Sequence, residues 1–361
     1  MIFLKAYLEN NLGDDLFVYI ITDRYPDTRF IITVPDEYKE IYEDRKNLII
    51  ISKNNFLYRI LSHFFRKYIP KLSVEKLINY FCRGSVYIGG SIFIQPPTDK
   101  YKKSLRSFYH FINKRFSAVI GCDFGPYVDK KFLVDYRAAF KKITDICFRD
   151  KYSYSLFEDI GNARYAPDAV FCLKKIPQVE QEKSVFISVI NLSNRPGLSH
   201  MQQTYENKLI DIINMFTDDG YTVKICTFCR AENDEITAHS ILGDRRLMNG
   251  DMVSPLYYRG NISDVTTSIM RSEIVIATRF HSMILGLLFG KKTFPIIYSK
   301  KMTSTLDYCG IDIEYTKIED IGKLSCENLK TILQNYRVPN LENIIRDADR
   351  QFEATDKYFR K

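Results

Sequence analysis

The sequence predicts an α/β protein with two doubly wound, Rossmann-like domains. Short apolar runs rich in β-branched residues alternate with amphipathic stretches along most of the 361-residue chain. Parallel strands buried on both faces have this apolar character, and helices connect them. The length exceeds that of a typical single core, and a polar, proline-containing stretch at 173–183 interrupts the rhythm. We therefore expect domains at 1–175 and 184–335, a linker at 176–183, and a C-terminal helix within 336–361.

Composition and charge narrow the function. Hydrophobic residues make up 45% of the chain and charged residues 27%, which excludes a disordered or collagen-like protein. The formal net charge of +8 suits an anionic partner. The motifs of nucleic-acid-binding proteins are missing, so we expect no nucleic-acid partner. Eight scattered cysteines are typical of reduced thiols. Neither a signal peptide nor an apolar run of ~18 residues is found, so we expect a soluble, cytoplasmic protein.

The first predicted element is a strand at Ile2 to Leu8, followed by a glycine-containing loop and a helix with apolar residues at 16, 17, 20 and 21. The loop reads Asn11-Leu12-Gly13-Asp14. It is not a Gly-x-Gly-x-x-Gly motif, so a dinucleotide site is not supported. Aspartate is a favoured N-cap residue, and we predict that Asp14 caps the helix. The alternative is that Asp14 or Asp15 accepts hydrogen bonds from hydroxyl groups of a ligand.

Strands are expected next at Phe30 to Val34 and Leu48 to Ile51, and the stretch 55–71 then has a different character. Its apolar residues share one helical face: Leu57, Ile60, Leu61 and Phe64. Basic residues surround that face: Arg59, His63, Arg66, Lys67 and Lys71. Such a composition is found in helices that bind membrane surfaces. We favour the alternative of an ordinary core-facing helix with a basic solvated side, because most amphipathic helices are of this kind.

Two glycine-containing loops and an arginine follow predicted strands in the first domain. Gly89-Gly90 ends a strand at 86–91, and a similar loop with Gly121, Gly125 and Pro126 ends the next strand. Such glycines let the backbone approach a ligand or make a tight turn. Arg149 ends a strand at 145–150, and a further strand is predicted at 167–171. Arg149 either binds an anion or pairs with Asp150 or Asp168.

The second domain repeats the strand and helix series. Strands are expected at Val185 to Ile190 and Tyr221 to Thr227, with helices near 200–216 and ending at Leu242. The polar loop 191–197 follows the first of these strands and should face a cleft between the domains. Cys226 and Cys229 have the spacing of a redox or zinc pair, but a second pair is missing, so we interpret them as strand-end thiols.

The most informative run extends from Ser272 to Tyr298. Ile274 to Ala277 form a predicted strand, Ser282 to Phe289 a buried helix closed by Gly290, and Phe294 to Ile297 a second strand. Arg279 and His281 fall between the first strand and the helix, where open α/β sheets bind ligands and free backbone N–H groups attract anions. A permanent cation and a group that titrates near neutrality therefore lie side by side.

This run resembles the signature of the polysaccharide pyruvyl transferase family. In that signature a strand leads to Arg, a large apolar residue and His, followed by a helix, a Pro-containing strand, Tyr and Lys. The corresponding residues are Arg279, Phe280, His281, Tyr298 and Lys301, with Phe280 where Leu is common. The loops at 11–14, 89–90 and 121–126 resemble the family more weakly. Two doubly wound domains joined by a linker also resemble the GT-B fold, with its cleft between the domains.

The resemblance implies a transferase that moves pyruvate from phosphoenolpyruvate onto two hydroxyls of a sugar as a ketal, in exopolysaccharide or capsule biosynthesis. His281 would then be the general acid or base. The substrate-binding residues would be Arg279 and Phe280, with Arg149, Lys301, Gly13, Asp14, Gly89 and Gly90. Phosphoenolpyruvate would be a substrate, and neither a cofactor nor a metal is needed. A lipid-linked saccharide acceptor would give the stretch 55–71 a role in peripheral contact with the inner face of the membrane.

Two other functions stay open. A GT-B glycosyltransferase would need cations and helix N-termini for the diphosphate of its sugar nucleotide, so Arg279 does not exclude it. A non-catalytic sugar-binding assembly protein is the third candidate, because a fold does not determine a function.

Overall fold

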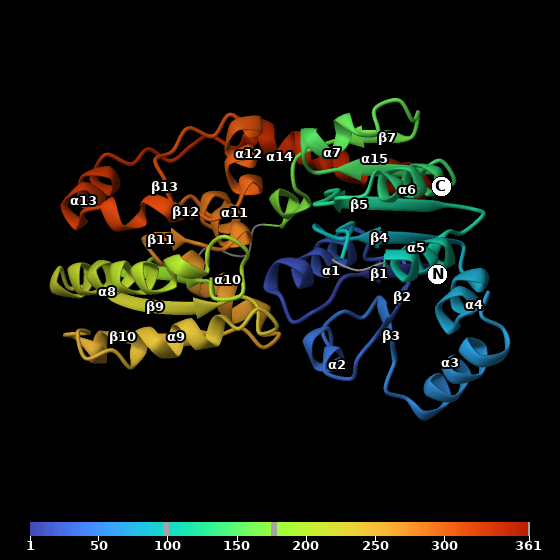
Figure 1. Cartoon of the computed structure of the whole chain (residues 1–361), viewed down its shortest axis with the longest axis horizontal. Helices are drawn as coiled ribbons and strands as arrows, with labels where there is room; N and C mark the ends of the chain where they lie inside the picture. The colour runs from blue at the N-terminus through green and yellow to red at the C-terminus, as the bar shows by residue number, and fades with distance from the viewer. Residues whose placement is uncertain (97–100, 175–178, 360–361) are drawn as a thin grey trace. The chain divides into compact units, whose positions relative to one another are not determined.

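The computed structural model describes residues 1–96, 101–174 and 179–359, and part of the predicted linker, 176–178, lies outside them. The chain forms two compact α/β units (Figure 1). Unit 1 comprises Met1–Leu8, Leu16–Lys174 and Ile344–Lys361, and unit 2 comprises Glu9–Asp15 and Lys175–Asn343. Each unit therefore contains a short segment that is remote in sequence from the rest of it.

Unit 1 is built on a parallel seven-stranded sheet with the order β3-β2-β1-β4-β5-β6-β7. The strands are β1 Ile2–Ala6, β2 Phe30–Val34, β3 Leu48–Ser52, β4 Gly84–Ile88, β5 Ser117–Cys122, β6 Asp145–Phe148 and β7 Ala163–Tyr165. Every residue of β2, β4 and β5 is buried, as expected for strands that are covered on both faces. The strands predicted near 30, 48, 86, 118 and 145 are confirmed.

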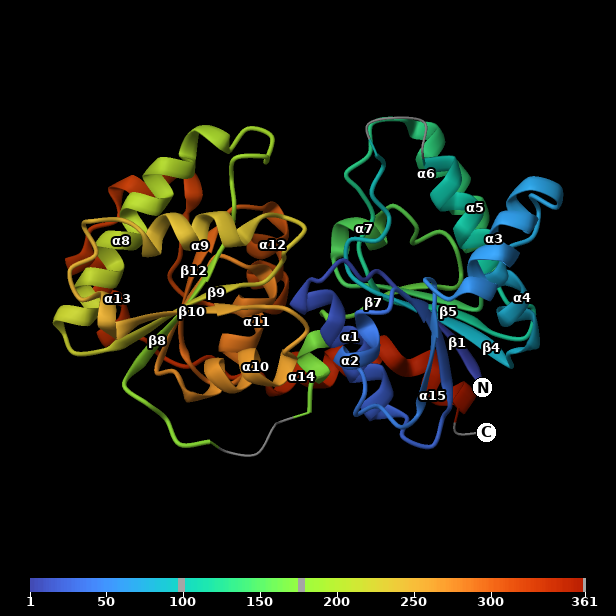
Figure 2. The ribbon, with the colours of Figure 1, turned by 90° about the horizontal axis from the view of Figure 1, so that it is seen from below.

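Helices cover both faces of this sheet. They are α1 Leu12–Arg24, α2 Tyr38–Ile41, α3 Phe56–Tyr68, α4 Val74–Phe81, α5 Tyr101–Phe111, α6 Lys130–Phe140, α7 Lys151–Ser155, α14 Glu342–Asp349 and α15 Glu353–Phe359. Figure 2 shows α1 and α15 on one face and α5 and α6 on the other. The core beneath α5 and α6 is largely aromatic, with the rings of Phe93 and Phe140 5.0 Å apart. Packed aromatic rings of this kind bury much apolar area per residue.

The C-terminal segment completes unit 1. We predicted a single helix, but α14 and α15 are separated by a 3-10 turn at Arg350–Phe352. The turn places the fully buried side chain of Gln351 against the sheet. Gly121 N–H donates to Gln351 Oε1 at 2.9 Å, and Gln351 Nε2 donates to the carbonyl of Ala166 at 2.8 Å. A continuous helix could not make these bonds, which explains the break.

Charged and polar contacts also attach this segment to α1. The guanidinium of Arg24 pairs with the carboxylates of Asp349 and Asp356. The hydroxyl groups of Tyr25 and Thr355 are 2.7 Å apart and both are buried. Residues at the two extremes of the sequence therefore share one hydrogen-bonded network in unit 1.

Unit 2 contains a parallel six-stranded sheet with the order β10-β9-β8-β11-β12-β13. Its strands are β8 Ser184–Val189, β9 Thr222–Thr227, β10 Val253–Tyr257, β11 Ile274–Ala277, β12 Lys292–Ile297 and β13 Thr316–Lys317. Its α-helices are α8 Gln202–Asp218, α9 Asp234–Leu242, α10 Ile262–Arg271, α11 Phe280–Leu288, α12 Lys300–Cys309 and α13 Cys326–Gln334. The strand order reverses between β8 and β11, and ligands bind doubly wound sheets at such a reversal. The predicted strand–helix–strand unit is confirmed as β11–α11–β12.

Two local predictions were wrong. The segment predicted as a strand at 167–171 is a 3-10 helix, Ala169–Cys172, because the side chain of Asp168 accepts a hydrogen bond from Val170 N–H and caps it. The helix predicted at 55–71 does form, as α3, with Asn55 as its N-cap. The side of the helix that faces the core is not the predicted one. Its buried side chains are Tyr58 and Phe65, and all four residues of the predicted apolar face are exposed.

Among the described residues, every helix is too short or too polar to cross a lipid bilayer.

Candidate functional site

The turn between β11 and α11 is fixed by buried hydrogen bonds. Ala277 of β11 pairs with Ser188 of β8. The hydroxyl of Ser188 accepts hydrogen bonds from the backbone N–H groups of Thr278 and Arg279, at 3.1 and 3.2 Å. Tyr205 of α8 donates to the hydroxyl of Thr278 at 2.9 Å. Arg279 is the N-cap residue of α11 and lies at the carboxyl end of β11, where the sequence predicted it.

The guanidinium of Arg279 is buried and bound by two carboxylates. Its Nη1 donates to Glu232 and its Nη2 to Asp234. Asp234 is fully buried and also accepts hydrogen bonds from the backbone of Phe228 and Cys229, at 3.0 and 2.9 Å. Burial acts to lower the pKa of Arg279, but the charges of Asp234 and Glu232 raise it well above its ordinary value. Asp234 is therefore a fixed counter-ion, and Arg279 is a permanent cation.

Glu232 is the more accessible of the two carboxylates, with 42% of its side chain exposed. The oxygen that accepts from Arg279 also accepts from Nη2 of Arg195, which follows β8. Burial acts to raise the pKa of Glu232, but the charges of Arg279 and Arg195 outweigh it and hold the pKa below its ordinary value. The guanidinium of Arg195 also lies 4.6 Å from the centre of the Tyr298 ring. An anionic oxygen is thus held between two arginines.

Arg195 and Glu232 were not among the predicted site residues. The only signal in the sequence was the polar loop 191–197 after β8, which contains Arg195. Nothing in the sequence around Glu232 distinguishes it from a solvated glutamate.

His281 lies in the first turn of α11 and packs against Gly13. Its ring is 4.9 Å from the ring of Phe280 in an edge-on arrangement. A Cβ atom placed on Gly13 would lie 2.6 Å from Cγ of His281 and closer still to Nδ1, so only glycine fits. Leu12 N–H donates to the carbonyl of Phe228 at 3.0 Å, which brings the start of α1 to this place in unit 2.

The prediction for Asp14 was wrong. The side chain of Asn11 accepts a hydrogen bond from Gly13 N–H at 3.0 Å, so Asn11 caps α1 and Asp14 lies in its first turn. Asp14 cannot be the N-cap residue, because the helix begins at Leu12, two residues before it. Asp15 is fully buried and accepts a hydrogen bond from Tyr258, which excludes the alternative that it contacts ligand hydroxyls. Asp14 is partly exposed.

Lys301 extends the cationic cluster. Its Nζ lies 5.2 Å from the centre of the Phe280 ring, and its charge contributes to the low pKa of Glu232 after those of Arg279 and Arg195. Contacts within unit 2 therefore link Arg279, Phe280, His281, Lys301 and Gly13 of the predicted site and add Arg195 and Glu232, whereas Asp14 is placed only by its position next to Gly13. Three cations around one partly exposed carboxylate can bind a dianion, and the imidazole of His281, which touches Phe280, can transfer a proton.

Arg149 belongs to unit 1, and its predicted role as an anion ligand is not supported. Its Nε donates to Asp123 at 3.1 Å, its Nη1 to Asp168 at 3.0 Å and its Nη2 to Ser91 at 3.1 Å. Only 4% of its side chain is exposed. A fork that already holds two carboxylates is a structural ion pair. Asp150, the other partner we considered, instead caps α7.

Gly89 and Gly90 lie with Arg149 in unit 1. A Cβ atom on Gly90 would lie 2.6 Å from Cζ of Arg149. The second glycine of this pair thus leaves room for the arginine side chain. This packing role explains why position 90 is a glycine, and no ligand is needed for the explanation.

Cys226 and Cys229 are free thiols, and both are buried. Burial raises the pKa of Cys229 to about 12, with the nearby charge of Arg279 opposing it. A thiol with so high a pKa is a poor nucleophile, which agrees with the interpretation of the pair as strand-end thiols.

Comparisons with known proteins identify the family. Residues 11–300 match the model of the family described as polysaccharide pyruvyl transferase. A curated relative, the amylovoran biosynthesis protein AmsJ of Erwinia amylovora, is 22% identical over 279 residues, which cover 70% of this chain and 65% of that protein. The match thus spans just under two thirds of the relative's length.

Solved structures resemble the chain in fold. A proposed UDP-N-acetylglucosamine 2-epimerase from Listeria monocytogenes superposes with a TM-score of 0.60 at 11% identity, covering 99% of this chain and 96% of that one. The UDP-N-acetylglucosamine 2-epimerase from Rickettsia bellii has a TM-score of 0.55 at 11% identity, with 99% and 94% covered. At such identities the likeness shows the fold alone, two Rossmann-like units of the GT-B kind. The family match includes the loop at Gly13 and the whole β11–α11–β12 unit with Arg279, Phe280 and His281, and the chain belongs to the polysaccharide pyruvyl transferase family.

Proposed function

We propose that the protein transfers the pyruvyl group of phosphoenolpyruvate onto two hydroxyl groups of a saccharide, forming a cyclic ketal during the biosynthesis of a surface polysaccharide. The observation that carries the proposal is the Glu232 carboxylate held between Arg195 and Arg279, with His281 two residues after Arg279 in the first turn of α11. Family membership supports it, and so does the similarity to a protein of amylovoran biosynthesis.

In this proposal an anionic group of the donor replaces the Glu232 carboxylate between the two arginines. Phosphoenolpyruvate carries a carboxylate and a phosphate, and either group has the charge and the oxygen geometry that two guanidiniums bind. Glu232 lies between β9 and α9 and is partly exposed, so its side chain can turn toward solvent and release both arginines. Asp234 keeps Arg279 in place during this exchange because it stays bound to the backbone of Phe228 and Cys229. Lys301 supplies a further positive charge for the second anionic group.

The proposed reaction begins with a proton from His281. The imidazolium protonates the methylene carbon of the donor, which becomes the methyl group and leaves an oxocarbenium centre at the adjacent carbon. One sugar hydroxyl forms a bond to this carbon and returns its proton to His281. The bond to the phosphate oxygen then breaks, the second hydroxyl forms the other ketal bond, and its proton leaves with the phosphate. Histidine suits both steps because its ordinary pKa is close to neutrality.

Thermal unfolding of the purified protein tests the donor. Phosphoenolpyruvate at a hundred times its dissociation constant should stabilise the protein by about 2.7 kcal/mol. The shift should be lost in Arg195→Ala and Arg279→Ala, and kept in Arg259→Ala. Arg259 is the matched control, because it also pairs with a glutamate in unit 2 but is 53% exposed.

The alternatives predict different results. A shift with a uridine diphospho-sugar and none with phosphoenolpyruvate would overturn the proposal in favour of a glycosyltransferase. Binding of saccharide without either donor would favour a non-catalytic protein. Because Arg279→Ala leaves Asp234 buried without its partner, Arg195→Ala provides the same test on a variant that keeps this buried pair.

A further inference from the structure

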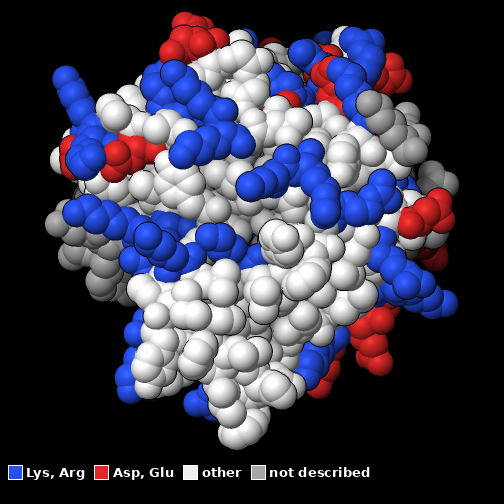
Figure 3. Space-filling view, turned by 90° about the vertical axis from the view of Figure 1, so that its right-hand side faces the viewer, with Lys and Arg blue, Asp and Glu red and all other residues white. Residues whose placement is uncertain are grey.

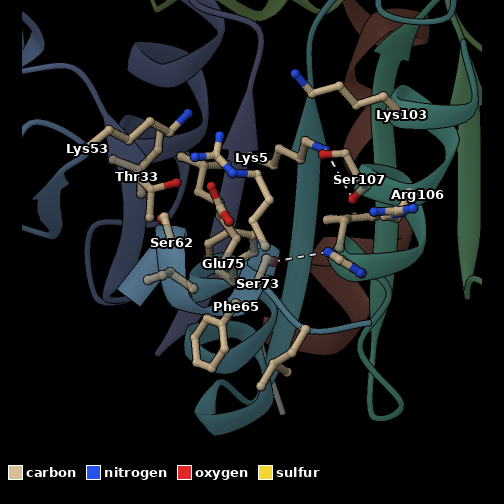
Figure 4. Close-up of a pocket in the computed structure, with 18 of the residues that line it drawn as sticks. Lys5, Thr33, Lys53, Ser62, Phe65, Ser73, Glu75, Lys103, Arg106 and Ser107 are labelled. Atoms are coloured by element: carbon tan, nitrogen blue, oxygen red, sulfur yellow. Dashed lines mark hydrogen bonds between the residues drawn. The ribbon is translucent and has the colours of Figure 1, made fainter. Parts of the chain in front are cut away.

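Unit 1 contains a cavity of about 400 Å³ that is separate from the Arg279 site. It is bordered by β1 and β2, by Lys53 directly after β3, and by the helices α3, α4 and α5. Its charged lining is strongly basic: Lys5, Lys53, Arg66, Lys103 and Arg106 face a single carboxylate, that of Glu75. Figure 4 shows Lys5 at the centre, with Lys53 on one side and Lys103 and Arg106 on the other. The cavity therefore suits an anion.

Glu75 is the single carboxylate among the described residues that line the cavity, so it can balance only part of the charge of the five cations. Among the described residues, none of the five lies in an ion pair. Lys5 Nζ instead donates to the hydroxyl of Ser107 at 2.8 Å. Burial lowers the pKa of Lys5 to about 8, with Glu75 opposing this shift and Lys53 adding to it. Clustered cations repel one another, and Lys5, which is partly buried, also loses hydration. A bound phosphate group would relieve both costs.

The helices beside the cavity expose an apolar surface, which we call the apolar face. It contains Phe56, Leu57, Ile60 and Phe64 of α3 with Tyr80 and Phe81 of α4. Phe56, Tyr80 and Phe81 are 78%, 74% and 72% exposed. Exposed aromatic residues grouped in this way mark a surface that binds a partner or a membrane.

Basic residues border the apolar face. Between residues 53 and 83 the only acidic residue is Glu75, whereas lysine and arginine recur throughout. Figure 3 shows a large uncharged lobe at the end of unit 1 that carries α3 and α4, with lysine and arginine side chains above it. Apolar and aromatic residues flanked by lysine and arginine are the composition of helices that lie in the interface of an anionic bilayer.

We propose that the apolar face docks unit 1 onto an anionic phospholipid bilayer and that the cationic cavity at its edge binds the phosphate headgroup of a membrane lipid. A second copy of the chain is a poorer occupant, because a two-fold contact would bring the same basic residues against each other. An acidic protein partner could match the charge but would not explain a cavity lined by five cations. The inference goes beyond the proposed transfer reaction, and its test measures membrane binding without any activity readout.

Vesicle flotation of the full chain tests the apolar face. The protein should float with vesicles of phosphatidylcholine mixed with phosphatidylglycerol or phosphatidic acid, and not with phosphatidylcholine alone. Phe56→Gln combined with Ile60→Gln should lower the partition coefficient by roughly tenfold or more, because two side chains no longer insert. Val134→Gln combined with Ile236→Gln is the matched control. Those residues are 60% and 59% exposed but lie outside the face, and partition should not change.

The cavity is tested by headgroup preference. Phosphatidic acid carries a phosphate monoester that can enter the cavity, so wild-type protein should bind its vesicles more tightly than phosphatidylglycerol vesicles. Lys103→Gln combined with Arg106→Gln should abolish this preference. Lys102→Gln combined with Lys114→Gln removes the same charge from exposed positions outside the cavity and should keep it.

Three results would overturn the inference. The first is wild-type protein that floats with none of the vesicles, or equally with all of them. The second is a dimer in light scattering that the Phe56 and Ile60 variant dissociates, since the face would then bind a second copy. The third is a thermal shift with free inorganic phosphate that is lost in the Lys103 and Arg106 variant while vesicle binding stays unchanged, since the cavity would then serve a soluble anion.

Discussion

Replacing Gly13 with alanine tests whether the position of His281 controls the reaction. The new Cβ atom would lie 2.6 Å from Cγ of His281. Carbon atoms in contact are normally ~3.5–4.0 Å apart, so the ring must move by about 1 Å or more. A misplacement of this size can cost on the order of 100-fold in rate. We expect kcat for the proposed pyruvyl transfer to fall by roughly 100-fold, close to the loss expected when His281, the proposed general acid, is removed altogether.

The double variant separates this clash from other effects. In Gly13→Ala with His281→Ala the Cβ atom meets no ring, so its rate should equal that of His281→Ala alone. Gly13 lies near the start of α1, where alanine is a better helix former, and the double variant should be more stable than His281→Ala by up to about 1 kcal/mol. Phosphate release under saturating donor and acceptor gives the rates, and urea unfolding gives the stabilities.

A matched glycine provides the control. A Cβ atom on Gly250, also in unit 2, would meet no atom within 4 Å, so Gly250→Ala should keep the wild-type rate. If Gly13→Ala also keeps it, or if the double variant is much slower than His281→Ala, the contact between Gly13 and His281 does not position the acid and the argument fails.

Four further predictions concern other residues. Glu232→Gln removes the carboxylate that, in the proposed function, competes with the donor, so calorimetry should give a roughly tenfold lower dissociation constant for phosphoenolpyruvate. An unchanged constant would mean that Glu232 does not occupy the proposed donor site. The pKa of Glu232 is lower in the folded state than its ordinary value of 4.5, so the ionised side chain stabilises the fold at pH values above 4.5. This stabilisation is lost as the pH falls through the folded-state pKa. The melting temperature of Glu232→Gln should therefore fall less on acidification than that of the wild-type protein. Gly90→Ala should destabilise unit 1 by ~1–3 kcal/mol through its clash with Arg149, without weakening donor binding, and an undisturbed melting temperature would contradict the packing role. The pKa of Lys5 is lowered from 10.5 to about 8, so the folded state releases its proton first, and the unfolding free energy of wild-type protein should rise relative to Lys5→Met as the pH goes from 8 to 10.5.

The parts of the fold that the sequence predicts best are those where periodicity alone carries the signal. The β11–α11–β12 unit was predicted to within two residues at each end, because β11 is wholly apolar and buried and β12 is apolar and buried from Phe294 to Ile297. The strand predicted at 167–171 shows the limit of this signal. Its apolar run is also compatible with a 3-10 helix, and this helix is capped by a hydrogen bond that the Asp168 side chain accepts from Val170 N–H.

Site residues could be predicted from the sequence only where they belong to a local motif. Arg279 and His281 follow from the turn after one strand, but Glu232 lies 47 residues before Arg279 and 37 after Arg195. The parallel sheet brings the carboxyl ends of β8, β9 and β11 together, and only the strand order 9-8-11 makes these residues neighbours. The prediction that Arg149 binds an anion is not supported, because its local motif is ambiguous. An arginine at a strand end satisfies the local pattern whether its partner is a ligand or a buried carboxylate such as Asp168.

The sequence also could not predict which side of α3 faces the core. The spacing of Leu57, Ile60, Leu61 and Phe64 shows that they share a helical face, but spacing does not say what covers that face. The core contact is made by Tyr58 and Phe65 instead, which lie on another side of the helix.

The division of unit 1 between the two ends of the sequence affects how the protein is made. A ribosome adds ~5–20 residues per second, so roughly 10–35 s pass between the synthesis of Lys174 and that of Gln351, about 180 residues later. Unit 2 needs nothing made after Asn343 and can finish first, which reverses the order of synthesis. During this interval Gly121 N–H and the carbonyl of Ala166 lack the side chain that they bind in the finished protein. Early termination near the 3′ end of the message would therefore damage the unit that was translated first.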